Sequence, residues 1–308
     1  MDDVTDTVFR QIVNSCAPAD MYFTEFVNVD GLQSVGRKNL LKKLRFSEDE
    51  GPLTAQLWGL EIKNFEKTAR EIASGTIARE LGLPKGVNFA SIDLNMGCPA
   101  KSEVKNGTCS ALINNRPLAS KIIKATQKGA SKLPVSVKTR IGWNEVDLSW
   151  IEFLLAHKLD MLTVHFRTRK EMSKVPAHWE YAAEIVKLRD KISPKTKIVG
   201  NGDVISRKQG ELLAKKYGLD GIMIGRGVFH DPFVFSKAEP WKGMGRDERV
   251  ALFRKHLVLF ESTWKDGERK FEPLKKFAKI YINDFEGAKD LREKVMSCHS
   301  IEEVLKVL

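Results

Sequence analysis

The residues "SIDLNMGCPAKSEVKNGTCSALI" (91–113) begin as a short run of alternating apolar residues and pass through Asn95 into a turn that contains a cysteine. In that turn Cys98 stands between Gly97 and Pro99. In folds built on parallel strands, polar groups directly after a buried strand are where ligands and chemistry are found. This stretch therefore predicts a strand that ends at a functional site.

Similar short, β-branched runs recur along the first 230 residues, separated by amphipathic stretches. The amphipathic stretches show apolar residues every three or four positions, as helices do; they cover residues 62–81, 117–128, 179–188 and 206–217. The alternation predicts repeated βα units around a parallel sheet. A closed (β/α)8 barrel has eight strands, and seven runs are visible, at residues 21–27, 52–58, 89–95, 134–140, 161–167, 197–202 and 220–226.

Polar residues end six of these runs, and their even spread decides between two architectures. In a (β/α)8 barrel all carboxyl ends of the strands converge on one mouth, whereas a doubly wound sheet gathers functional groups at one or two crevices. The spread favours the α/β class and a TIM barrel. The groups are Gln56, Asn95 with Cys98, Lys138 with Arg140, His165 with Arg167, Asn201 with Asp203, and Gly225 with Arg226.

The βα alternation stops after Pro240. The remaining sequence reads as helices at residues 246–263 and 272–285, with one or two more at 288–308. A linker with proline and glycines precedes them, as is common at domain boundaries. We expect a barrel domain over residues 1–240 and a small helical domain over residues 241–308.

Charge and composition narrow the function classes. The net charge of +11 fits either a polyanionic partner such as nucleic acid or simply a charged surface. The sequence contains no apolar run of the roughly 20 residues that a membrane span needs and no secretory leader, so we expect a cytoplasmic protein without a membrane partner. Its cysteines and histidines lack metal-ligand spacing, and the Walker A, GxGxxG and GxSxG motifs are absent, so we expect no metal.

Two glycine-containing segments, "GNGD" (200–203) and "IGRG" (224–227), follow the last two runs. Small residues there allow backbone N–H groups to approach an anion, and the loops after the last two strands of such barrels often bind phosphate. Arg226 adds a charged donor. The alternative is that these glycines only form tight turns, but two adjacent segments favour a ligand that carries phosphate.

The run "VSVKTR" (135–140) places Lys138 and Arg140 on one side of its strand, because side chains alternate. If Val135 and Val137 pack under the helices, Lys138 points into the barrel, where a lysine is costly without an anionic partner. His165 and Arg167 repeat the arrangement on the next strand. The alternative places both charges in solvent at the end of the strand.

Cys98 allows several interpretations. A free cysteine is often a small buried hydrophobe, and this is our interpretation of Cys16 and Cys298. Because Cys98 lies beyond the end of its strand, it can instead be a nucleophile, a redox partner or a proton donor. A resolving cysteine would have to be Cys109.

Taken together, these motifs resemble the tRNA-dihydrouridine synthase family. The similarity lies in "DLNMGCPAKSEVKNGTCSALI", "VKTRIGW", "VHFRTRKEMSKVPAHWE", "GNGD" and "GIMIGRG", in the family's order, and extends from Asp3 to about Phe235. The resemblance implies a monomeric FMN barrel that reduces the C5–C6 double bond of uridine in tRNA with NADPH. It also implies that the helical tail binds tRNA.

Site roles follow from the same resemblance. Cys98 is similar to the family's proton donor, and Arg140 and Arg167 look like residues near the flavin and the substrate RNA. The positions that match flavin contacts are Gln56, Asn95, Lys138 and His165, with Asn201, Gly202, Asp203, Gly225 and Arg226 in the phosphate and ribityl region.

The sequence departs from the family at its start, where a strand ending in Pro-Met and small residues usually precedes "(V/I)TD" but this chain opens "MDDVTD". We expect the first barrel strand to be absent: either upstream residues are missing, or the barrel lacks a strand and its flavin site is compromised. A second departure is Phe166, where the family usually has glycine. Two functional alternatives remain: an FMN reductase of a free pyrimidine or small enone, and a non-catalytic tRNA-binding protein.

Overall fold

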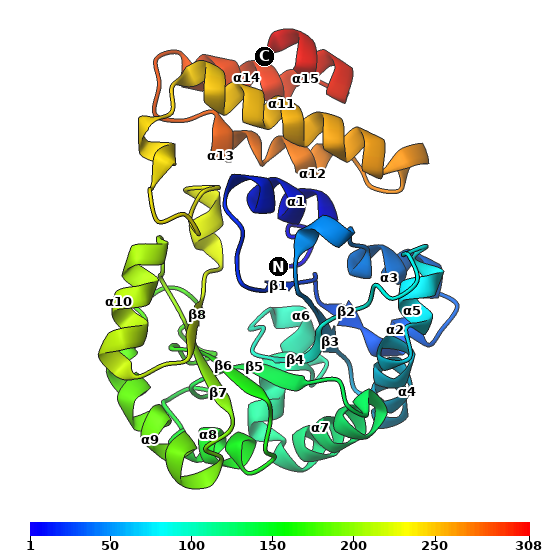
Figure 1. The fold of residues 1–308 in the computed structure, drawn as a ribbon, viewed down its shortest axis with the longest axis vertical. Coiled ribbons are helices and arrows are strands. Elements are labelled where there is room, and N and C mark those ends of the chain that lie inside the picture. The colour runs from blue at the N-terminus through cyan, green and yellow to red at the C-terminus, as the bar shows by residue number, and fades with distance from the viewer.

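The computed structural model describes residues 1–308, apart from the side chain of Asp266. Its centre is a curved parallel sheet of eight strands in the order β1-β3-β4-β5-β6-β7-β8, with β2 also paired to β3 (Figure 1). The strands are β1 (Tyr22–Phe23), β2 (Val27–Asn28), β3 (Leu53–Trp58), β4 (Ser91–Met96), β5 (Val135–Arg140), β6 (Met161–His165), β7 (Lys197–Asn201) and β8 (Gly221–Met223). Each of the seven predicted runs contains strand, which confirms the βα alternation.

The first predicted run, residues 21–27, forms two very short strands instead of one. Both β1 and β2 pair with β3, but Thr24 lies between them. The hydroxyl of Thr24 accepts a hydrogen bond from the backbone N–H of Gln56 at 3.0 Å. A side chain therefore takes the place of a backbone acceptor at this point, and the regular ladder is interrupted.

The sheet has two edges, β1 and β8, which do not pair with each other within the described residues. The expected (β/α)8 architecture is confirmed in its strand order and in the helices that surround the sheet (Figure 1). The first strand of the described structure begins at Tyr22, after helix α1.

Helices cover the outer face of the sheet, and polar side chains fix where several begin. Asp147 accepts from the N–H of Trp150, and Ser206 accepts from that of Gln209, as N-caps do. The predicted helix 62–81 is divided because Gly75 has φ +70°. The helices up to residue 217 are α1 (Thr7–Cys16), α2 (Val29–Leu32), α3 (Arg37–Leu41), α4 (Ile62–Ala73), α5 (Thr76–Glu80), α6 (Lys101–Lys105), α7 (Arg116–Ala130), α8 (Leu148–Leu155), α9 (Ala182–Ile192) and α10 (Arg207–Tyr217).

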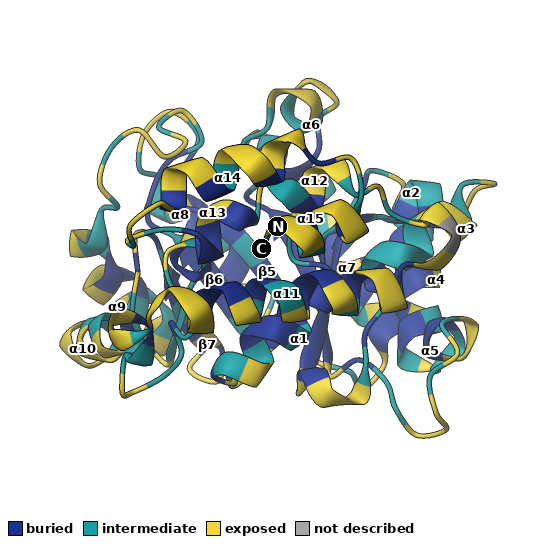
Figure 2. Cartoon of the chain, turned by 90° about the horizontal axis from the view of Figure 1, so that it is seen from above, coloured by how far each residue is buried: buried dark blue, intermediate teal, exposed yellow. Residues whose placement is uncertain are grey.

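Strand β5 shows which side of the sheet faces the helices. Trp150 of α8 donates from its indole N–H to the hydroxyl of Thr139 at 2.9 Å, so Thr139 faces the helical layer. Ser136, on the opposite side, bonds to Asp93 of β4. The predicted inward orientation of Lys138 is therefore confirmed. Figure 2 shows the buried residues gathered in the strands and on the inner helix faces.

The chain ends in the helices α11 (Arg246–Thr263), α12 (Glu272–Lys275), α13 (Ala278–Tyr281), α14 (Ala288–Ser297) and α15 (Ile301–Val307). They meet the barrel through α1: the Phe9 ring lies 6.0 Å from Phe229, just after β8, and 5.1 Å from Phe277. Trp264 donates to Asp6 at 2.8 Å. The division at residue 240 into separate domains stays a prediction. Among the described residues, no helix is both long and apolar enough to span a membrane.

Helices α4 and α7 touch at Gly129. A Cβ atom there would lie 2.1 Å from the carbonyl oxygen of Glu66 and 2.9 Å from Cβ of Ala69. We expect Gly129→Ala to lower the free energy of unfolding by about 2 kcal/mol, because overpacking outweighs the gain in helix propensity. Urea unfolding measures this. Lys124→Ala, on the exposed face of α7, is the control and should change stability by less than about 0.5 kcal/mol; equal effects would contradict the packing argument.

Candidate active site

The parallel register of the sheet brings the predicted site residues to one edge. Asn95 pairs with Lys138 across β4 and β5, Arg140 pairs with His165 across β5 and β6, and His165 pairs with Asn201 across β6 and β7. Because the strands are parallel, all of these positions lie at carboxyl ends. Four strands thus contribute side chains to a single site.

Asn95 builds the turn that carries Cys98. Its side-chain oxygen accepts from the backbone N–H groups of Gly97 at 3.1 Å and Cys98 at 3.0 Å. Gly97 leaves little room for a side chain, since a Cβ would lie 3.2 Å from Cα of Thr139 on β5 and the backbone there would have to shift. The turn is therefore pressed against the neighbouring strand, and the half-buried Cys98 has a fixed backbone.

Arg140 braces the same turn from β5. Its guanidinium donates to the carbonyl oxygens of Gly97 at 2.9 Å, Thr168 at 2.9 Å and Met172 at 2.8 Å. Burial and the nearby Arg167 lower the pKa of Arg140 to about 10. Arg140 thus joins the Cys98 turn to the loop after β6. Its expected contact with substrate stays a prediction.

Asp93 is a member of the site that the sequence argument missed. This fully buried carboxylate accepts from Gln56 at 2.8 Å and from the hydroxyl of Ser136 at 2.6 Å. Burial raises its pKa to about 6, against the effect of these hydrogen bonds and of Lys138. The signal for it was present, because Asp93 alternates with Asn95 and shares its face of β4.

Lys138 is the least compensated charge in the site. Among the described residues, its ammonium has neither a hydrogen bond nor an ion pair within 4.0 Å. Burial and Arg140 lower its pKa to about 8, although Asp93 and Cys98 act in the opposite direction. A cation in this situation is stabilised by a ligand that brings negative charge or an electron-rich atom.

His165 is held in its neutral form. Burial, followed by the cationic side chains of Lys138, Arg140 and Arg167, holds its pKa well below the usual range. Arg167 also donates to Nε2 of His165 at 3.2 Å. A nitrogen that accepts carries no proton, so this contact assigns the imidazole proton to Nδ1.

Asp203 lies on the far side of the site, near the guanidinium groups of Arg167 and Arg226. Its carboxylate pairs with Arg167, accepts from the N–H of Ala177 at 3.0 Å, and lies 3.5 Å from the half-exposed guanidinium of Arg226. Asp203 itself has φ +55°, a conformation that non-glycine residues seldom adopt. Arg226 therefore lies close to Asp203 and still has donors for a ligand.

The two glycine segments differ in how much space they leave. Gly202 has φ +135°, and a Cβ there would lie 2.7 Å from that of Ala177, so this glycine makes a tight turn. By contrast, a Cβ on Gly225 would meet nothing within 4 Å. The open space before Gly225, beside Arg226, suits an anionic group. Asn201 supports this end by donating to the carbonyl of Met223 at 2.8 Å.

Cys98 is paired with a second thiol. The backbone N–H of Ser110 donates to the carbonyl of Cys98 at 3.3 Å, which places Cys109 next to Cys98. The neighbouring Cys109 thiol is the main cause that lowers the pKa of Cys98 to about 7, while the pKa of Cys109 is raised. Cys109 is fully buried and has φ +53°.

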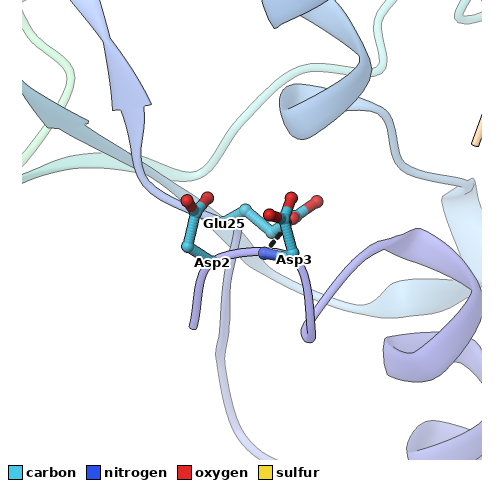
Figure 3. A group of neighbouring side chains, drawn as sticks. All are labelled: Asp2, Asp3 and Glu25. Carbon is cyan, nitrogen blue, oxygen red and sulfur yellow. Dashed lines mark hydrogen bonds between the residues drawn. The ribbon is translucent and has the colours of Figure 1, made fainter. Parts of the chain in front are cut away.

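A separate acidic group lies near the start of the chain. The carboxylates of Asp2, Asp3 and Glu25 each have an oxygen within 4.8 Å of the others (Figure 3). Lys43 pairs with Asp2, and Arg269 contacts Glu25 at 2.5 Å. Because these cations already compensate the carboxylates, we assign no metal to this group.

Comparison with known proteins decides the family. The profile described as "Dihydrouridine synthase" matches residues 1–308. The chain belongs to the dihydrouridine synthase family. A "probable tRNA-dihydrouridine synthase" of Staphylococcus aureus is 43% identical over all of this chain and 90% of its own length. A second relative, the "probable tRNA-dihydrouridine synthase 2" of Bacillus subtilis, is 42% identical over all of this chain and 91% of its own length.

The fold is also found in a solved structure of distant sequence. Morphinone reductase superimposes with a TM-score of 0.51 at 11% identity, over 79% of this chain and 83% of that chain. At this identity the similarity concerns the fold. It agrees with the (β/α)8 arrangement of this dihydrouridine synthase.

We expect Cys109→Gly to raise the pKa of Cys98 from about 7 by about one pH unit, because the thiolate loses a donor. Glycine also suits the φ of +53°. The pH dependence of iodoacetamide alkylation, followed by the mass of the Cys98 peptide, measures this. Ser110→Ala, which leaves both thiols in place, is the matched control; identical profiles for Cys109→Gly and wild type would show that the thiols do not interact.

We expect Lys138→Met to stabilise the flavin-free protein at pH 7 by about 1 kcal/mol, because it removes a poorly solvated charge. The pKa of Lys138 is lowered to about 8, so the unfolded chain holds more protons above that pH. Wild-type stability should therefore rise relative to the variant between about pH 8 and 10.5. Thermal or urea unfolding across this range is the measurement. The exposed Lys121→Met should show no such pH dependence, and a flat difference for Lys138→Met would refute the argument.

Proposed function

We propose that this dihydrouridine synthase binds FMN at the strand ends, takes its reducing equivalents from NADPH and reduces the C5–C6 double bond of uridine in tRNA. One observation carries the proposal: Cys98 stands on a braced turn beside Lys138, a cation without a partner among the described residues. The names of the Staphylococcus and Bacillus relatives support tRNA as the substrate.

The residues present fit a flavin phosphate and an electron-rich ring. Gly225 leaves room for a phosphate, and Arg226 is the nearby donor, close to Asp203. Lys138 and neutral His165, which would donate from Nδ1, face the same space as Gln56 and Asn95 and would hold the ring. Asn201 and Gly202 would shape the wall between these two parts. Bound FMN supplies the hydride for the reduction.

Cys98 would deliver the proton. Saturating the double bond requires a hydride at one carbon and a proton at its neighbour, and a general acid works best when its pKa is near the working pH. With its pKa lowered to about 7 by the Cys109 thiol, Cys98 is a stronger acid than an ordinary cysteine and is still partly protonated at neutral pH. Proton exchange with water would restore the thiol after each turnover.

The RNA would be held by charge outside the site. The net charge of +11 provides attraction for phosphates, and we propose that the helices after residue 240 share in binding. The target base must leave its stack to reach the strand ends, at a cost of a few kcal/mol in a duplex and less in a loop. Arg167 donates hydrogen bonds to Asp203 and His165, and in this position it would support the substrate pocket.

The test compares wild type with Cys98→Ala. We expect the variant to keep its bound flavin and its NADPH oxidation in air, and to lose about 100-fold or more of its turnover on tRNA, since general acid catalysis contributes about that much. The substrate is tRNA that lacks the modification. The amount of dihydrouridine formed in it, measured colorimetrically, gives the rate. Cys298→Ala, distant from the strand ends, is the matched control.

Three results would contradict the proposal. Equal turnover of Cys98→Ala and wild type on tRNA would remove Cys98 from the acid role. Activity on free uracil or orotate with none on tRNA would assign the site to a small pyrimidine instead, and a colourless protein that binds tRNA would exclude the flavin.

A further inference from the structure

Asp93 is a buried acid that the proposed reaction does not use. Its carboxylate is fully buried in β4, one alternation below Asn95, on the inner side of the sheet. A buried carboxylate costs several kcal/mol unless its oxygens are hydrogen-bonded. The two hydrogen-bond partners of Asp93, Gln56 and Ser136, are therefore the place to look for its role.

The hydrogen bonds of Asp93 determine which way the side-chain amide of Gln56 is turned. One oxygen of Asp93 accepts from Ser136 at 2.6 Å, and the other accepts from Nε2 of Gln56 at 2.8 Å. An ionised carboxylate has only acceptors. The amide of Gln56 must therefore turn its NH₂ group toward Asp93, and its carbonyl oxygen points away from Asp93.

Asn95 imposes the same orientation from the other side. Its Oδ1 is held by the N–H groups of Gly97 and Cys98, so its Nδ2 is directed elsewhere and lies 3.5 Å from Oε1 of Gln56. A flipped Gln56 would set two NH₂ groups against each other. The 3.5 Å contact is long for a hydrogen bond, which leaves Oε1 able to accept from a ligand.

We propose that Asp93 is a positioning residue that locks the amide of Gln56, so that the site offers a carbonyl oxygen, and not an NH₂ group, to its cofactor. The inference rests on the proposed binding of FMN. It specifies the chemistry at this position: the bound ring must present an N–H donor, as the imide of a flavin does. A ligand with only acceptors at this edge would be rejected, because Gln56 cannot turn to meet it.

The test removes the acceptor without leaving a hole. Asp93→Leu has the same branching as aspartate and accepts no hydrogen bond, so Gln56 loses its 2.8 Å constraint and keeps only the long 3.5 Å contact with Asn95. We expect the affinity for FMN, measured by quenching of flavin fluorescence at pH 7.5, to fall about tenfold, which corresponds to about 1.4 kcal/mol. Binding by wild type tests the proposed function itself, whereas the difference between the two proteins tests the role of Asp93.

Asp93→Asn separates orientation from charge. Asparagine can offer its oxygen to Gln56 and its NH₂ to Ser136, whose hydroxyl also accepts, and Asn95 disfavours the reversed arrangement. We therefore expect Asp93→Asn to bind FMN within about twofold of wild type. Ser136→Ala, which removes the other hydrogen bond of Asp93 and leaves the one to Gln56, should also bind normally.

Unfolding of the flavin-free variants shows whether a loss of FMN affinity follows from a loss of stability. A purely structural Asp93 predicts that FMN affinity falls in step with the melting temperature in all three variants, and this result would overturn the inference. Equal affinity of Asp93→Leu and wild type, or equal loss in Asp93→Asn and Asp93→Leu, would overturn it too. If Asp93→Leu does not fold, Asp93→Ala, in which water can fill the space, takes its place with the same expected loss.

Discussion

The register of the parallel strands is the constraint on which the rest of this structure depends. Pairing Asn95 with Lys138, and Arg140 with His165, places residues far apart in sequence at one edge of the sheet. A shift of one residue along β5 would turn Lys138 and Arg140 toward the helices and Val137 toward the site. Trp150, which bonds to Thr139, helps to fix this register from the outer side.

An excess of positive charge follows from that arrangement. Lys138, Arg140, Arg167 and Arg226 converge on the site, and together with burial they keep His165 neutral. Some of this charge is used internally, because Arg140 binds three backbone carbonyls and Arg167 pairs with Asp203. Lys138 and part of Arg226 remain for a ligand. The electrostatics thus favour an anionic, electron-rich ligand, and we propose that Cys98 on its fixed turn donates the proton at this site.

The sequence permitted much of this to be predicted, because the informative patterns are local. Period-two alternation predicted the inner face of β5, and the helix at 246–263 begins and ends as expected. The predicted helix at 272–285 instead forms α12 and α13, divided near Lys276. The family resemblance identified Cys98 and the residues around it, and the structure brings most of them to one edge.

Contacts between distant segments were beyond prediction. Nothing in "VSVKTR" indicates that Arg140 binds the carbonyl of Met172, 32 residues away. The break at Thr24 depends on Gln56, and the left-handed backbone of Cys109 depends on the packing of its loop against the Cys98 turn. Asp93 was visible as an acid inside a strand, but its role depends on two partners from neighbouring strands.

The central claim is that these strand ends reduce uridine within tRNA, and mass spectrometry of the RNA tests it most directly. Purified protein is incubated with FMN, NADPH and tRNA from cells that lack the gene, and the digested nucleosides are compared with those of a reaction without protein. The account predicts uridine that has gained two hydrogens, at defined positions, only when protein and reductant are both present. Intact tRNA that binds the protein and shows no change in nucleoside mass would contradict it.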